Sequence, residues 1–108
     1  MRKILILIIC LPLLALAQQT INASINHGGI TRDYILYVPA SYSAVTEVPL
    51  VFNFHGYTSN ASQQMFYGDF RTIADTEGFI IVHPEGTLDN SGATHWNVGW
   101  GGSTIDDI

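Results

Sequence analysis

The sequence predicts an α/β fold in which an antiparallel hairpin leads into a strand–helix–strand (βαβ) unit of a mostly parallel sheet. Two apolar runs of strand length, residues 50–54 and 79–82, flank a segment whose apolar residues recur at helical spacing. A Gly-Gly pair separates two earlier β-prone runs, as in a hairpin. Parallel strands joined by a helix form a right-handed crossover, so both apolar strands are expected to be covered on both faces.

The first 17 residues have the layout of a secretory signal peptide and do not belong to the predicted fold. Arg2 and Lys3 precede an uncharged apolar run that closes with Ala15-Leu16-Ala17. The run is shorter than the about 20 residues that span a bilayer, which argues against a membrane anchor. We therefore predict cleavage after Ala17 and a secreted protein, either extracellular or periplasmic.

Cys10 is the single cysteine and lies within this signal segment. A lipoprotein signal needs a small residue before its cysteine, whereas here Ile9 precedes it, so Cys10 is interpreted as an ordinary apolar residue. Its removal leaves residues 18–108 without the disulfides that small secreted domains commonly need. This lack is a first indication that residues 18–108 are the N-terminal portion of a longer domain, truncated at the C-terminus.

The mature chain is strongly acidic. Removal of the signal segment leaves two basic residues, Arg32 and Arg71, against nine acidic ones, which gives a net charge of −7. Such a surface repels phosphate backbones and anionic lipids, so neither nucleic acid nor, after signal cleavage, a membrane is an expected partner. A neutral or weakly charged substrate fits better.

The hairpin is predicted from two strands, residues 21–25 and 30–38, that flank the turn Asn26-His27-Gly28-Gly29. His27 is expected to be exposed in this turn, without a chemical role. Residues 39–47 begin with proline and are polar, so they are expected to form a surface loop.

One helix is predicted between the two apolar strands. Asn60 is a good N-cap, with Gln63 in capping-box position, and Gly78 supplies the stop. The expected buried face consists of residues at helical spacing: Phe66, Phe70, Ile73 and Ala74.

Residues 87–108 are rich in Gly, Asn and Ser but contain both tryptophans, Trp96 and Trp100. Tryptophans in such a loop favour a pocket lining over free exposure. Asp106-Asp107-Ile108 is typical of the N-cap and first turn of a helix. Two Asn-x-Ser sequons, at Asn22 and Asn60, are compatible with glycosylation.

Four stretches carry a family resemblance. They are Tyr34-Ile35-Leu36-Tyr37-Val38-Pro39, Val48-Pro49-Leu50-Val51-Phe52-Asn53-Phe54-His55-Gly56, residues 73–87 and residues 96–107. In this order and spacing they resemble the secreted polyhydroxybutyrate depolymerases and feruloyl or acetylxylan esterases of the α/β-hydrolase fold. The resemblance spans essentially all of residues 31–108 and implies an incomplete, N-terminal part of that fold.

The resemblance implies a serine-type carboxylic ester hydrolase that needs no cofactor or metal. It would act on polyester or on feruloyl or acetyl esters of plant polysaccharide. In such enzymes a serine attacks the ester carbonyl while two main-chain N–H groups stabilise the oxyanion. By this resemblance the main chain of Tyr57 is one oxyanion donor, Gly56 lets substrate approach, and His55 shapes the loop. His95, Trp96 and Trp100 are candidate substrate contacts.

The sequence lacks the nucleophile that the resemblance implies. No Gly-x-Ser-x-Gly occurs in the 108 residues, and the nearest pattern, Gly101-Gly102-Ser103-Thr104-Ile105, lacks the last glycine. The nucleophile, acid and base are therefore expected beyond Ile108, and residues 18–108 alone are predicted to be inactive.

Two alternatives remain open at this point. A non-catalytic module that binds carbohydrate or another polymer would use Trp96, Trp100 and Tyr57. A metal site made of His83, His95 and Asp89 lacks any recognisable ligand spacing, so no metal is expected.

Overall fold

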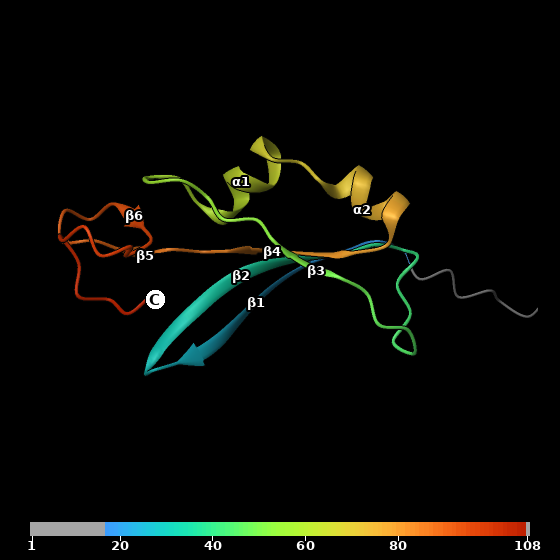
Figure 1. Cartoon of the computed structure of the whole chain (residues 1–108), viewed down its shortest axis with the longest axis horizontal. Coiled ribbons are helices and arrows are strands. Elements are labelled where there is room, and N and C mark those ends of the chain that lie inside the picture. The colour runs from blue at the N-terminus through green and yellow to red at the C-terminus, as the bar shows by residue number, and fades with distance from the viewer. Residues whose placement is uncertain (1–16, 108) are drawn as a thin grey trace, which may run out of the picture.

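The computed structural model describes residues 17–107, which form a four-stranded sheet with two short helices on one face and a small second sheet at one end (Figure 1). The predicted signal peptide, apart from Ala17, lies outside the described residues. The large sheet contains β1 (Gln19–His27), β2 (Ile30–Val38), β3 (Leu50–Phe52) and β4 (Ile80–Pro84). The remaining elements are α1 (Ala61–Tyr67), α2 (Arg71–Glu77), β5 (Thr87–Leu88) and β6 (Thr94–His95).

The predicted α/β class with a mostly parallel sheet is wrong. The strand order is β1-β2-β4-β3, and both the β1–β2 and the β2–β4 pairings are antiparallel. Only β3 and β4, the two strands of the predicted strand–helix–strand unit, pair in parallel. Apolar periodicity shows that a strand is buried but not the direction of its neighbour. Here the long hairpin pairs with β4 and makes the sheet mostly antiparallel.

The hairpin of β1 and β2 is confirmed: β2 has the predicted bounds, whereas β1 is longer than the predicted residues 21–25. Gly28 and Gly29 have φ angles of 58° and 78°, which a two-residue type I′ turn requires and which glycine adopts without strain. The pairing starts at His27 and Ile30 and continues without a break to Gln19 and Val38.

The expectation that the strand starting at Leu50 is covered on both faces is wrong. β3 is three residues long and lies at the edge of the sheet. Leu50, Phe52 and Phe54 are 52%, 56% and 54% exposed, because the two helices cover only the opposite face (Figure 1). β4 is the interior strand instead, and the side chains of Ile81 and His83 are fully buried in it.

Two helices replace the single predicted one. Asn60 is confirmed as the N-cap of α1, where its side-chain oxygen accepts the N–H of Gln63 at 2.8 Å. α1 ends at Gly68, whose carbonyl accepts a hydrogen bond from the Asn53 side chain. Gly78 is confirmed as the stop of α2, with a φ of 73°.

The buried helix face also differs from the predicted one. Of the predicted face, Ala74 is confirmed as buried, whereas Phe66, Phe70 and Ile73 are 67%, 41% and 51% exposed. Ala61 and Met65 are the buried residues of α1. The break at Gly68 changes the helical phase between α1 and α2, so one continuous 3.6-residue pattern could not predict which side chains face the sheet.

The core lies between β2, β4 and α2, where Tyr37, Ala74 and Ile81 pack together with Phe79. The Tyr37 hydroxyl donates to the carboxylate of Asp75 at 2.8 Å, which ties β2 to α2. Burial, followed by this hydrogen bond, raises the pKa of Tyr37 to about 12. The tyrosine is therefore neutral and acts as a structural donor.

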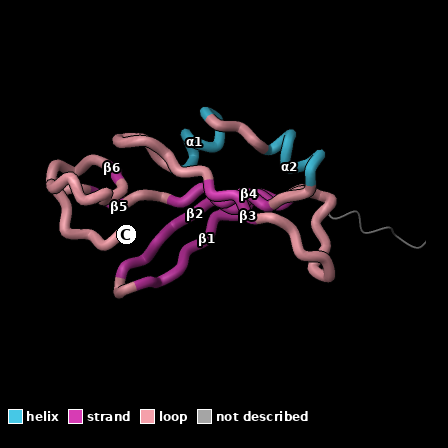
Figure 2. The backbone as a smooth tube through the Cα atoms, viewed as in Figure 1, coloured by secondary structure: helices cyan, strands magenta, loops and turns pink. Residues whose placement is uncertain are grey.

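The C-terminal segment is mostly loop (Figure 2) and folds back to β2. Asp107 pairs with Arg32 at 2.7 Å, and its other oxygen accepts the N–H of Asn97 at 2.7 Å. Asp106 and Asp107 are not helical, so the expected first helical turn is absent from the described residues; Ile108 lies outside them.

Candidate functional site

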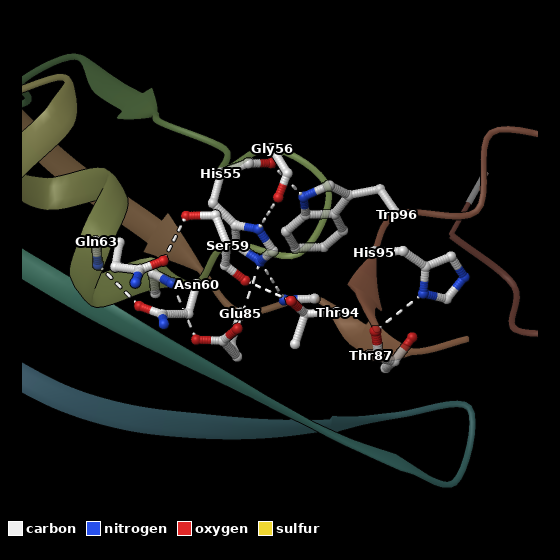
Figure 3. A network of polar contacts seen from close by, with 12 residues as sticks. His55, Gly56, Ser59, Asn60, Gln63, Glu85, Thr87, Thr94, His95 and Trp96 are labelled. Atoms are coloured by element: carbon white, nitrogen blue, oxygen red, sulfur yellow. Dashed lines mark hydrogen bonds and ion pairs between the residues drawn. The ribbon is translucent and has the colours of Figure 1, made fainter. Parts of the chain in front are cut away.

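The candidate site is the segment that follows β3, residues 55–59, which we call the β3 loop. Figure 3 shows it at close range. Side chains and carbonyls from the end of β4 and from the β5–β6 hairpin contact it from two directions. Residues that follow the β3 loop by about thirty to forty positions in the chain therefore fix the conformation of the loop, as the contacts below show.

His55 anchors the start of the loop. Its ring is 2% exposed, and the main-chain N–H of Gly86 donates to Nε2 at 2.9 Å. Nε2 must therefore carry a lone pair, which places the proton on Nδ1, where it is donated to the carbonyl of Gly56 at 2.8 Å. The Glu85 carboxylate lies 3.4 Å from Nε2. Since both ring nitrogens are already bonded, His55 holds the loop in place and is not poised to accept a proton.

Trp96 supports the same residue from the open face of the sheet. Its indole N–H donates to the carbonyl of His55 at 3.0 Å. The indole ring meets Phe54 edge-on, with 5.0 Å between the ring centroids. These two aromatic side chains line a cavity of about 600 Å³ on that open face.

Residues 56–59 form a turn of strained geometry. The N–H of Ser59 donates to the carbonyl of Gly56 at 3.1 Å, and Thr58, at the third position, has a φ of 67°. This is the pattern of a type II turn, whose third position normally holds glycine or asparagine. Thr58 is the only non-glycine residue with positive φ among residues 17–107, and its branched side chain makes that conformation costly.

The β5–β6 hairpin contacts this turn at three points. The N–H of Thr58 donates to the carbonyl of Thr94 at 2.9 Å, and the Thr94 hydroxyl donates to the carbonyl of Ser59. The Tyr57 hydroxyl donates to Oδ2 of Asp89 at 2.8 Å. Both main-chain and side-chain groups of the hairpin therefore hold the turn.

The main-chain donors next to the turn are left available. Within the part of the chain that the structure describes, the N–H groups of Gly56 and Tyr57 have no hydrogen-bond partner. A Cβ placed on Gly56 would meet no atom within 4 Å. An open, rigid loop with two unused N–H groups can bind a carbonyl oxygen or an anion.

The structure gathers some of the predicted site residues and not others. His55, Gly56, Tyr57 and Trp96 lie in or against the β3 loop. Trp100 is 93% exposed and contacts none of them. His95 is buried, and its Nδ1 contacts the carbonyl of Thr87 at 2.9 Å. The substrate roles of Trp96, Trp100 and His95 stay predictions.

Two further candidates from the sequence are Ser103, in the pattern nearest to Gly-x-Ser-x-Gly, and the alternative metal site of His83, His95 and Asp89. The Ser103 hydroxyl accepts the N–H of Ile105 at 3.2 Å, and His95 does not bond to it. Across residues 17–107, no group of three or more His, Cys, Asp or Glu side chains could hold a metal ion.

Sequence reasoning missed the residues that hold the loop: Gly86, Asp89 and Thr94. Only the position of Gly86, directly after the second apolar strand, gave a signal. A Cβ on Gly86 would lie 2.5 Å from the carbonyl oxygen of His95 and 3.1 Å from the His55 ring, so this position requires glycine because of close packing.

Comparison with known proteins gives one similarity. No protein-family profile matches the chain. Over 80 residues it is 30% identical to the bifunctional acetylxylan esterase/xylanase XynS20E of Neocallimastix patriciarum. The match covers 74% of this chain but only 11% of that protein. Neither helix of residues 17–107 is long and apolar enough to cross a membrane.

Proposed function

We propose that this chain carries the oxyanion-binding loop of a secreted serine-type carboxylic ester hydrolase. The observation that carries the proposal is the pair of adjacent unused N–H groups at Gly56 and Tyr57, in a loop whose next two N–H groups, those of Thr58 and Ser59, are bonded. Preorganised N–H donors aimed at a developing oxyanion contribute about 3 kcal/mol each to transition-state stabilisation. The similarity to an acetylxylan esterase/xylanase supports the same chemistry.

Gly56 has a specific role in this proposal. No positive φ and no close contact within the described residues require glycine there. A ligand that must approach the main chain closely does require it, because any side chain would occupy that space. The carbonyl oxygen of an ester at this position would lie against the N–H groups of Gly56 and Tyr57.

The covalent chemistry requires a nucleophile that this sequence lacks. We place the serine, its histidine base and the acid that orients the histidine in polypeptide beyond these 108 residues, since no Gly-x-Ser-x-Gly occurs within them. The serine oxygen would attack the ester carbonyl, and the negative charge formed on the carbonyl oxygen would be stabilised by the β3 loop. His55 does not serve as the base, because both of its ring nitrogens are bonded.

We further propose that the substrate is an acetyl or feruloyl ester on plant polysaccharide, or a polyester such as polyhydroxyalkanoate. The mature chain carries a net charge of −7, which favours an uncharged polymer over an anionic one. The cavity beside the loop is lined mainly by aromatic and aliphatic side chains, among them Phe52, Phe54 and Trp96. Charged side chains, most of them acidic, also contribute to the lining: Arg32, Asp33, Glu85, Asp106 and Asp107.

The test uses the full gene product, purified from the culture medium. It should be labelled by a fluorophosphonate probe at one serine outside this chain and should hydrolyse a short-chain nitrophenyl ester. Release of acetate from acetylated xylan, ferulate from a feruloylated arabinoxylan or hydroxybutyrate from its polymer then identifies the substrate. A product that binds xylan but neither labels nor hydrolyses would establish a binding module instead. Labelling at Ser103 that is abolished by Ser103→Ala would overturn the placement of the nucleophile.

A further inference from the structure

We infer that the β5–β6 hairpin holds the β3 loop in its strained turn, and that Thr94 and Asp89 are positioning residues for Tyr57 and its main-chain donor. The expected effect on catalysis rests on the proposed function. The expected effect on the conformation of the turn can be measured even if the protein has no esterase activity.

The first step concerns what the turn would do by itself. A type II turn and a type I turn differ by rotation of the peptide between the two central residues, here Tyr57 and Thr58. In the type I form Thr58 would have a negative φ, which its branched side chain prefers. Its observed φ of 67° is therefore imposed from outside the turn.

The second step identifies what imposes it. The N–H that would rotate belongs to Thr58, and it donates to the carbonyl of Thr94 in β6. In the type I form this N–H would point away, and the carbonyl of Tyr57 would face the Thr94 oxygen. The Thr94 hydroxyl additionally donates to the carbonyl of Ser59. The conformational strain of one threonine at positive φ and the net stabilisation by one hydrogen bond are of the same order. Each of these two bonds therefore affects the equilibrium between the type II and type I forms of the turn.

The third step concerns the side chain of Tyr57, which is tied to the same hairpin through Asp89. One oxygen of that carboxylate accepts the Tyr57 hydroxyl. The other accepts the N–H groups of Ser91 and Ala93 at 2.8 and 2.9 Å and the Ser91 hydroxyl at 2.7 Å. These donors, Ser91 foremost, hold the pKa of Asp89 well below its usual range, so the acceptor stays charged and strong. The hairpin turn and the β3 loop thus share one carboxylate.

The consequence is that Tyr57 is fixed at both ends. Its hydroxyl is bonded to Asp89, and the peptide that follows it is bonded to Thr94. The N–H of Tyr57 belongs to the preceding Gly56–Tyr57 peptide, which the exchange between turn types does not itself rotate. Because the Tyr57 side chain and the following peptide are both bonded to the hairpin, the Cα between them is held, and with it the direction of this N–H relative to the sheet.

The experiment uses the full gene product and four variants. Thr94→Val removes only the hydroxyl, and Tyr57→Phe removes only the bond to Asp89. Thr76→Val and Tyr67→Phe are the matched controls, because Thr76 bonds only within α2 and the Tyr67 side chain is 84% exposed. The measurements are amide hydrogen exchange at Thr58 and the kcat and KM for a nitrophenyl ester.

In Thr94→Val and Tyr57→Phe we expect the Thr58 amide to exchange about threefold to tenfold faster and kcat to fall by a similar factor, with little change in KM. Both controls should stay within twofold of the unsubstituted protein. Thr58→Gly, which removes the strain of positive φ, should restore exchange protection and kcat when combined with Thr94→Val. Rescue of this kind distinguishes restraint of the turn from a general loss of stability.

Unchanged exchange and kcat in both test variants would overturn the inference, and so would failure of Thr58→Gly to rescue Thr94→Val. A gene product without any esterase activity counts against the proposed function, not against this inference. In that case the exchange rates of Thr58 in the same variants decide it.

Discussion

The main-chain N–H of Gly86 donates to Nε2 of His55 at 2.9 Å, and this one bond sets the tautomer of the histidine. It joins the end of β4 to the start of the β3 loop. Because a Cβ on Gly86 would lie 2.5 Å from the His95 carbonyl oxygen and 3.1 Å from the His55 ring, the bond depends on glycine.

Gly86→Ala should therefore destabilise the protein by about 1–3 kcal/mol, the usual cost of overpacking. The His95 carbonyl belongs to the main chain and cannot yield as the end of a flexible side chain would. Chemical denaturation of the full gene product measures the change in the free energy of unfolding. An unfolding free energy within about 0.5 kcal/mol of the unsubstituted protein would show that the two segments separate easily.

Gly56→Ala should lower the activity without lowering the free energy of unfolding. Its Cβ would meet no atom within 4 Å, so the free energy of unfolding should not fall, and less entropy in the unfolded chain could raise it by about 0.4–1 kcal/mol. In the full gene product kcat should fall at least about tenfold, since the methyl group enters the space proposed for the ester carbonyl. A stable variant with unchanged kcat would remove Gly56 and Tyr57 from the site.

His83 should make the protein less stable in weak acid. Its ring is fully buried and neither ring nitrogen has a hydrogen-bond partner among the described residues. Burial, with a smaller contribution from the Arg71 charge, lowers the pKa of His83 below the ordinary 6.5. As the pH falls below 6.5 the unfolded chain binds a proton that the folded one does not, so stability decreases by at most about 1.4 kcal/mol per pH unit.

The measurement is the unfolding free energy between pH 7 and pH 5. His83→Phe, which cannot bind the proton, should flatten this dependence, whereas His27→Gln at the exposed end of β1 serves as the control and should leave the decrease in place. An equally steep decrease in His83→Phe would assign the acid sensitivity to other groups.

Secreted material should begin at Gln18. The basic residues Arg2 and Lys3, the apolar run and the Ala15-Leu16-Ala17 site predict cleavage at this point. N-terminal sequencing or intact mass of protein from the medium tests it, with allowance for cyclisation of the new N-terminal glutamine. A mature protein that keeps Met1, or that carries lipid on Cys10, would contradict the prediction.

The sequence by itself determined the local features of this protein. The Gly28-Gly29 turn, the Asn60 cap and the Gly78 stop follow from conformational preferences of single residues, and all three are present. The apolar run that leads to His55-Gly56 is a local signal of the same kind, and it predicted a functional loop after β3; the catalytic role of that loop stays a prediction. The parallel pairing of β3 with β4 also followed from the strand–helix–strand order.

Only the tertiary structure decided the antiparallel pairing of β2 with β4, the exposure of β3 and the groups that hold the loop. The residue pattern of an apolar strand is the same whether the neighbouring strand is parallel or antiparallel. The antiparallel pairing of β2 with β4 could therefore not be predicted from the sequence pattern. The positive φ of Thr58 has no local cause either, since threonine disfavours it. It arises from a hydrogen bond to Thr94, which lies thirty-six residues further along the chain. Such contacts depend on the closure of long loops, and no pattern within a short window of residues encodes them.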